Sequence, residues 1–325
     1  MNYHPSSLRK KPLSPVSRGI LSTGLIRLDR ALGIGGIPRG EFIEITGGIS
    51  SGKTTLCQHI VSEAQRAGEI CGWLDIDHSL DPTYAIRCGV EPDLLYVIEP
   101  DNAEMAFDIL HSLVSSGSFT IIILDSIHNL ISRDELGESL SDKNWICVDR
   151  LFSQTLSRVR KTIHENKTTI IFTELVSPGI GSVYQHLAQN LSRLATKLQS
   201  SVRIRLETFQ DIKQKNNFIG NRIKVRVTKN QYSPCFQRTF FDIIYNKGID
   251  KSGEIFDVGT ELGLIQFNAE SYWFQAQEIG NERAEVLSFL DQNRWITEEI
   301  EKNIRQILLL DVQPAVQENI TATIE

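Results

Sequence analysis

The sequence predicts an α/β fold: a mainly parallel sheet flanked by helices, an antiparallel extension and a small C-terminal α+β domain. From Gly40 onward, short apolar runs alternate with amphipathic stretches, which is the order of a parallel sheet covered on both faces. Strands are expected at residues 42–45, 71–76, 94–98, 119–124 and 168–172, and helices at 53–67, 103–115 and 145–164. In the last helix, apolar residues recur on one face at helical spacing.

After Ser200 the pattern changes. Residues 202–206, 223–227 and 239–245 alternate between apolar and polar, which is typical of antiparallel strands with one wet face. From Lys251 the pattern is mixed and then helical, with a final helix expected at 298–310. We therefore expect three parts, namely a flexible basic tail (1–18), a large core (19–250) and a small C-terminal domain with its tail (251–325).

Composition excludes several classes of protein. Of the 325 residues, 41% are hydrophobic and 23% are charged, as in ordinary globular proteins, and no apolar run approaches the length of a membrane span. The five cysteines are dispersed without a C-x-x-C pair, which favours reduced thiols in a cytosolic protein over disulfides or a zinc site. The net charge of −6 argues against a basic coat for nucleic acid, although it leaves room for a local basic groove.

The first eighteen residues contain no acid and lack the apolar stretch of a secretory signal. They share the bias of an organelle transit peptide, but the segment is short and has no clear amphipathic face. A flexible tail is the interpretation that fits the composition better.

The chain contains a complete phosphate-binding loop of the pattern G-x-x-x-x-G-K-S/T. It reads Gly47-Gly48-Ile49-Ser50-Ser51-Gly52-Lys53-Thr54, with an apolar strand before it and an amphipathic helix, beginning near Thr55, after it. The backbone N–H groups of such a loop converge on one anion, and the helix N-terminus adds partial positive charge. Lys53 is placed to reach the terminal phosphates and Thr54 to ligate Mg²⁺. The sequence therefore predicts binding of a nucleoside triphosphate.

Two carboxylates follow expected strands of the same sheet. Asp125 ends the apolar run 120–124, and we expect it to hold Mg²⁺ at the carboxyl edge of the sheet, where open α/β sheets bind ligands. Asp77 ends the run 73–76 near that edge, where it is placed to orient or deprotonate an attacking water. Alternatively, Asp77 is the N-cap of the helix that follows His78.

With these segments in place, the chain resembles the bacterial RecA recombinase family. The likeness runs from about Ile20 to the C-terminal helix, and the segments that carry it are Leu21-Ser22-Thr23-Gly24, Leu28-Asp29, Ala31-Leu32-Gly33, Glu44-Ile45, Ser50 to Thr55, Asp77-His78, Leu80-Asp81-Pro82, Leu124-Asp125-Ser126, Lys229-Asn230 and Gly253-Glu254. The resemblance implies a RecA-like P-loop ATPase core that uses ATP and Mg²⁺. It also implies a filament on single-stranded DNA, exchange of strands with homologous duplex DNA, and roles in DNA repair and the SOS response.

The resemblance also implies roles for single residues around the nucleotide. It assigns Lys53 and Thr54 to binding of the phosphates and Mg²⁺, and Asp125 to binding of the metal. Asp81 and Tyr84 fall where the family contacts adenine.

Two further positions depart from the family or reach beyond one subunit. Asp77 stands where the family has its water-activating glutamate, so this carboxylate is one methylene shorter. Lys229 matches a lysine that reaches the γ-phosphate of the neighbouring subunit, whereas Gln231 replaces a second such lysine. Nucleotide binding is therefore better supported than fast hydrolysis.

The first DNA loop is expected at about 136–149, with Arg150 and Gln154 on the following helix. Trp145 stands where the family has an apolar wedge between base triplets, and a tryptophan is suited to stack there. Alternatively, Trp145 is a half-buried aromatic at the start of a helix, and Arg150 is ordinary solvated surface.

The second DNA loop is expected at about 176–193, and it diverges more. Ile180-Gly181 matches the family's other wedge, but Leu175 replaces the glutamine that senses the γ-phosphate. The loop is polar and nearly uncharged, so we expect weak DNA binding unless Arg193 and Lys197 compensate.

The tail over residues 1–18 contains three prolines and is a poor substitute for the family's leading helix, which docks on the next subunit. Two hypotheses remain at this stage. One is a DNA-dependent ATPase that self-associates and exchanges strands. The other is an ATP-binding relative that has lost exchange and serves as an accessory module for another recombinase. Self-association as a filament or ring is expected of the chain, with long filaments favouring the first hypothesis and small rings or monomers the second.

Overall fold

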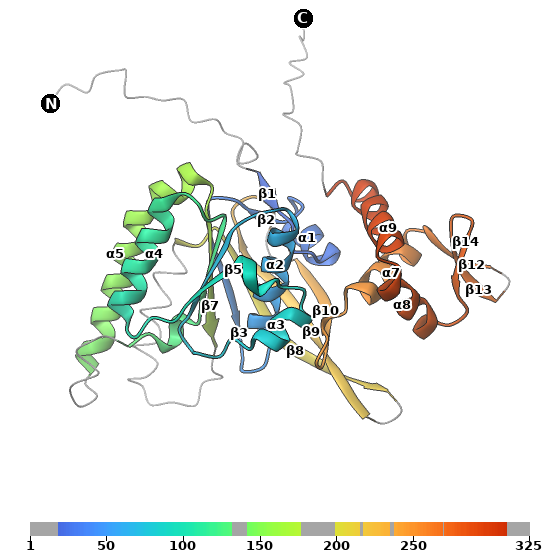
Figure 1. The fold of residues 1–325 in the computed structure, drawn as a ribbon, viewed down its shortest axis with the longest axis horizontal. Coiled ribbons are helices and arrows are strands. Elements are labelled where there is room, and N and C mark those ends of the chain that lie inside the picture. The colour runs from blue at the N-terminus through green and yellow to red at the C-terminus, as the bar shows by residue number, and fades with distance from the viewer. Residues whose placement is uncertain are drawn as a thin grey trace, which may run out of the picture.

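The computed structural model describes residues 19–131, 142–176, 199–214, 217–234, 237–268 and 270–310 (Figure 1). Nine of the described strands form one sheet in the order β11-β10-β9-β8-β3-β7-β6-β4-β5. Their bounds are β3 Phe42–Gly47, β4 Cys71–Asp75, β5 Leu95–Ile98, β6 Ile121–Asp125, β7 Thr169–Leu175, β8 Val202–Gln214, β9 Asn217–Asn230, β10 Arg238–Ile244 and β11 Gly248–Ile249. Strands from β8 to β5 pair in parallel and those from β8 to β11 pair antiparallel. The predicted α/β class is confirmed.

Helices cover both faces of the parallel part of the sheet. They are α1 Ile26–Leu32, α2 Lys53–Arg66, α3 Pro82–Arg87, α4 Ala103–Ser116 and α5 Asp142–Asn166, with short 3₁₀ turns at Pro92–Leu94 and Ile127–Asn129. Figure 1 shows α4 and α5 side by side on one face. In the apolar cluster there, the ring of Phe152 stacks on Phe107 and meets Phe172 edge-on. On the other face, α1 and α2 pack against apolar residues that include Ile43 and Val225. The apolar face predicted for α5 is buried here.

The C-terminal region has an apolar cluster of its own. It contains α7 Lys251–Glu261, β12 Ile265–Asn268, β13 Ser271–Phe274, β14 Gln277–Gly280, α8 Arg283–Gln292 and α9 Arg294–Ile307. The final helix begins at Arg294, four residues before the predicted start at residue 298. Trp295, one of the additional residues, is exposed.

Two buried polar contacts attach this region to α1. The carboxylate of Glu254 accepts hydrogen bonds from the backbone N–H groups of Ile26 (3.1 Å) and Arg27 (2.8 Å). Burial raises the pKa of Glu254 to about 7. Arg305 of α9 forms an ion pair with buried Asp29 at 2.9 Å. Contacts of this kind fix the orientation of the C-terminal region relative to α1, because removing one partner leaves the other polar group buried without a partner.

The predicted tail over residues 1–18 lies outside the described residues, as do the final fifteen residues. A short antiparallel pair, β1 Ile20–Leu21 and β2 Ile37–Pro38, precedes the main sheet. Within the described ranges, no helix combines the length and apolar character needed to cross a membrane. Cys57, Cys71 and Cys88 are buried free thiols.

Candidate nucleotide site

The phosphate loop connects the end of β3 to the start of α2, as the sequence predicts. Gly47 closes β3, and a Cβ atom there would come within 2.2 Å of the Ser51 hydroxyl oxygen and 2.8 Å of the Leu206 carbonyl oxygen. Gly52 has a φ of 86°, in the left-handed region, and a Cβ atom there would meet Ile243 at 2.4 Å. Both positions therefore require glycine for steric reasons.

The lysine of the loop folds back over the loop itself. Lys53 Nζ donates to the carbonyl oxygens of Gly48 (2.9 Å) and Gly47 (3.2 Å). Partial burial lowers the pKa of Lys53, and the nearby carboxylate of Asp125 opposes that shift. Ile49 at the tip is 82% exposed, whereas the Ser51 hydroxyl is buried without a hydrogen-bond partner among the described residues. The loop thus offers an ammonium group and a buried spare hydroxyl behind a tip that is open to solvent.

The two residues predicted to hold the metal lie in direct contact. Thr54 Oγ1 donates to Asp125 Oδ2 at 2.6 Å, and Thr173 of β7 donates to the other carboxylate oxygen. Burial raises the pKa of Asp125, while these two hydrogen bonds lower it. A hydroxyl and a carboxylate oxygen are ligands that suit Mg²⁺, which is usually held by one or two protein groups together with substrate phosphates. Consistent with that, the described residues contain no group of three or more His, Cys, Asp or Glu side chains placed to hold a metal alone.

Asp77 faces the same site, and the alternative assignment of this residue as a helix cap is wrong. Its carboxylate accepts from the Ser126 hydroxyl (3.1 Å) and from Asn129 Nδ2 (2.9 Å). The next helix, α3, begins at Pro82 and is capped by Asp81, whose side chain accepts from the Thr83 N–H at 2.8 Å. The chain needs four more residues after Asp77 before it turns into the helix, so the cap falls on the later aspartate.

The predicted adenine contacts lie beside the start of α2. The hydroxyl groups of Tyr84 and Thr55 are 3.3 Å apart, and Tyr84 is half-buried. Asp81 is exposed at the start of α3. The structure therefore places both predicted residues on the helix next to the loop, and their contact with a base stays a prediction.

Lys229 does not reach the loop of its own chain. It lies in β9 opposite Arg203, which lies opposite Glu44 in β3. Glu44 precedes Gly47 by three residues, and β9 is two strands away from β3. The backbone of Lys229 therefore lies about 10 Å from Gly47 along the strand direction and about 10 Å from it across the sheet. Burial lowers the pKa of Lys229, and Glu44 opposes the shift.

The predicted DNA-binding residues are described only in part. Arg150 and Gln154 are exposed on α5. The backbone of Trp145 belongs to α5, but its side chain lies outside the described part, as do Ile180, Gly181 and Arg193 entirely. These DNA contacts stay predictions.

Sequence reasoning missed several polar partners of the site. The Asp125 carboxylate accepts from Thr173, and the Asp77 carboxylate accepts from Ser126 and Asn129. Each donor follows its acceptor in the sequence. Buried Glu44 pairs with Arg203 at 2.5 Å beside Lys229. One signal was available: Glu44 is a charged residue inside the apolar run Phe42 to Ile45, and a buried charge needs a partner.

The sheet order, the phosphate loop and the carboxylate beside it define the class of P-loop proteins with an α/β core. The family described as RecA N-terminal domain matches residues 10–250. The protein RecA of Chloroflexus aurantiacus is 40% identical over 285 residues, covering 88% of this chain and 81% of that protein. That of Desulforapulum autotrophicum is 41% identical over 300 residues, covering 92% and 86%. That of Mycobacteroides abscessus is 39% identical over 294 residues, covering 90% and 84%.

The chain belongs to the RecA family. Its fold is also similar to the crystal structure of the RadB recombinase, with a TM-score of 0.51 and 20% identity. That match covers 71% of this chain and 98% of the other, so it supports the fold alone.

Proposed function

We propose that this chain is an ATP-dependent recombinase that binds single-stranded DNA and acts in homologous recombination, DNA repair and the response to DNA damage. Membership of the RecA family supports this role, since the identity extends over most of the chain. Because function resides in sites and not in folds, the observation that carries the proposal is local. It is the contact of Thr54 with buried Asp125, directly beside the phosphate loop.

In this proposal the chain acts as a DNA-dependent ATPase with the following roles. The loop N–H groups and Lys53 bind the phosphates, and Thr54 and Asp125 hold Mg²⁺, which supplies charge neutralisation at the phosphates. Asp77 orients the attacking water, whose oxygen bonds to the γ-phosphorus as the bond to the bridging oxygen breaks. The hydrogen bonds from Ser126 and Asn129 fix the Asp77 carboxylate but also occupy its lone pairs. Because these two donors compete with the attacking water for the Asp77 carboxylate, we expect a modest rate of ATP hydrolysis.

The proposed site is completed by a second subunit. The position of Lys229, away from its own loop, supports a role at the neighbouring subunit's γ-phosphate, like an arginine finger. The exposed ledge around Ile49 leaves space for such a neighbour. We also propose that residues 19–250 form the ATPase core, that 251–325 form a separate small domain with its tail, and that Trp145, Arg150, Gln154, Ile180, Gly181 and Arg193 contact DNA.

A strand-exchange assay tests this function. The purified chain is incubated with ATP, Mg²⁺, a single-stranded circle and a homologous linear duplex, and joint molecules are counted. Joint molecules that depend on ATP and on homology are expected. Absence of joint molecules together with absence of DNA-stimulated ATP hydrolysis would overturn the proposal.

A second candidate is an ATP-binding relative without strand exchange that assists another recombinase. Leu175 favours it, because this apolar side chain ends the strand beside the loop where a polar sensor is expected. Gln231 also favours this second candidate, because it stands where the family has a second lysine. Sedimentation with ATP and single-stranded DNA separates the candidates, since long filaments are expected of a recombinase and small rings or monomers of an accessory module.

A further inference from the structure

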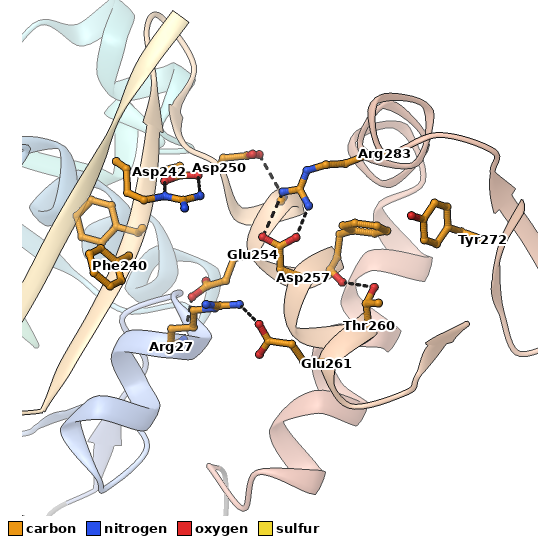
Figure 2. A pocket seen from close by; sticks show the side chains of 14 residues that line it. Arg27, Phe240, Asp242, Asp250, Glu254, Asp257, Thr260, Glu261, Tyr272 and Arg283 are labelled. Carbon is orange, nitrogen blue, oxygen red and sulfur yellow. Dashed lines mark hydrogen bonds and ion pairs between the residues drawn. The ribbon is translucent and has the colours of Figure 1, made fainter. Parts of the chain in front are cut away.

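A hollow of about 450 Å³ lies between α1, the start of β10 and the end of α7. Leu308, just after α9, also lines it, so the hollow borders both the main sheet and the C-terminal region. It adjoins a second hollow of about 510 Å³, and the two share Arg27 and Glu261. Figure 2 shows these two side chains pointing toward one another from α1 and α7, at 2.5 Å.

The smaller hollow has an excess of positive charge. Its lining contains the guanidinium groups of Arg27, Arg30 and Arg238 but only one carboxylate, that of Glu261. Glu261 is engaged by Arg27, whereas Arg30 and Arg238 are exposed and form no ion pair with another described residue. Two arginines without an acid in one concave site are a suitable arrangement for an oxyanion, because the guanidinium fork matches its geometry.

One residue of the same lining, Arg238, has a backbone donor that the sheet does not use. The Val227 N–H donates to the Gln237 carbonyl oxygen, so Gln237 is directed toward β9 and the next residue, Arg238, is directed away from it. On that outer side β11 pairs only with Ile243 and Ile244. The N–H of Arg238, a residue of the hollow's lining, therefore points away from β9 and forms no ladder hydrogen bond within the described part of the sheet. A backbone N–H beside two guanidinium groups is a typical anion-binding combination.

The neighbouring hollow differs in its charges. There Arg222 is paired with Asp242 in a two-point contact. Figure 2 shows Arg283 paired with Asp257 in the same way. Its lining contains five carboxylates against three arginines. An anion is therefore repelled from the larger hollow and attracted to the smaller one.

We infer that the hollow between α1, β10 and α7 is a binding site for a phosphate group, held by Arg30, Arg238 and the Arg238 N–H. The phosphate is that of a small molecule or of a nucleic-acid backbone, because both present the same oxyanion. All three donors come from α1 and β10, and the occupant lies beside the end of α7. Binding to the folded chain alone then raises the melting temperature by mass action.

Inorganic phosphate is the probe, and the phosphate loop must first be disabled because it binds the same anion. In the full chain carrying Lys53→Ala, the melting temperature is measured in sodium phosphate and in sodium chloride of equal ionic strength. We expect a higher melting temperature in phosphate. Adding Arg30→Gln and Arg238→Gln should weaken the apparent phosphate affinity at least about tenfold, the loss expected for charge-assisted hydrogen bonds.

The matched control is Arg294→Gln, which removes an exposed arginine paired with Glu298 on α9 and should leave the phosphate effect unchanged. The pair Arg30→Lys and Arg238→Lys keeps the charges without the forks and should give an intermediate affinity. A phosphate effect that persists in the double Gln variant, or its absence from Lys53→Ala, overturns the site. Duplex DNA titrated into the same variants identifies the source: a parallel loss of affinity assigns a nucleic-acid backbone, and an unchanged affinity assigns a small phosphate.

Discussion

Strands β6 and β7 lie next to each other in the sheet and end at the same edge, yet their ends differ in chemistry. β6 ends in Asp125, a buried carboxylate that accepts hydrogen bonds from Thr54 and Thr173. β7 ends in Leu175, opposite Gly47 of the phosphate loop, and the next N–H, that of Val176, donates to the Gly47 carbonyl oxygen at 3.0 Å. The apolar end is therefore the one that touches the loop backbone.

The difference separates nucleotide binding from the coupling of the bound nucleotide to DNA. A carboxylate with two hydrogen-bond donors is suited to hold a metal. A leucine side chain forms no hydrogen bond to a phosphate oxygen, so the β7 end cannot report the γ-phosphate in that way. We therefore expect the β6 end to serve nucleotide binding, and we expect communication from nucleotide to DNA to be weakened at β7.

The largest expected effect comes from Lys229→Ala. If Lys229 completes the neighbouring site, its loss should lower DNA-stimulated ATP hydrolysis by about 10³-fold, as for a missing arginine finger. Nucleotide binding to the monomer should stay unchanged, because this lysine lies far from its own loop. Steady-state phosphate release and binding of a fluorescent nucleotide give the two values. Lys213→Ala, at an exposed position near the end of β8, is the control.

Replacing Asp125 by Asn should lower ATP hydrolysis by about 10²-fold, the usual cost of losing one electrostatic stabiliser of the transition state. The amide keeps the shape but loses the negative charge for Mg²⁺. The variant should also require more Mg²⁺ for half-maximal rate, whereas Asp93→Asn at an exposed turn should not. An unchanged Mg²⁺ requirement would remove Asp125 from the metal site.

The converse change at the other strand end is Leu175→Gln. Restoring a polar side chain beside Gly47 should raise DNA-stimulated ATP hydrolysis by about threefold, close to the worth of one ordinary hydrogen bond. Leu175→Met, which stays apolar, should leave the rate near that of the parent. If the glutamine and methionine variants behave alike, the weak communication has another cause.

The smallest effect concerns pH. Burial raises the pKa of Asp125, so its metal-binding charge is lost at a higher pH than for an ordinary aspartate as the solution is acidified. Mg²⁺-dependent nucleotide binding should therefore weaken as the solution is acidified, beginning at a higher pH than for an ordinary aspartate, while Mg²⁺-independent binding changes less. Isothermal titration with and without a chelator measures both, and the Asp125→Asn variant should show no such Mg²⁺-dependent difference.

Features fixed by short stretches of sequence were predictable. The phosphate loop needs only the strand before it and the helix after it, and the contact of Thr54 with Asp125 needs only that Asp125 end a strand of the same sheet. The partners of Asp77 were not predictable, because Ser126 and Asn129 approach it only once β4 and β6 pair. The hollow lined by Arg30 and Arg238 likewise depends on packing of α1 against β10, segments about two hundred residues apart in the sequence.

The most direct test of the central claim, an ATP site shared between two subunits, is a mixing experiment. Lys53→Ala lacks a working loop but keeps Lys229, and Lys229→Ala keeps the loop but lacks the completing lysine. Each variant alone should be nearly inactive in DNA-stimulated ATP hydrolysis. Mixed in equal amounts with single-stranded DNA, they should recover about a quarter of the parent rate, since about one interface in four then joins two intact halves. A mixture no more active than its components would contradict a site shared between subunits.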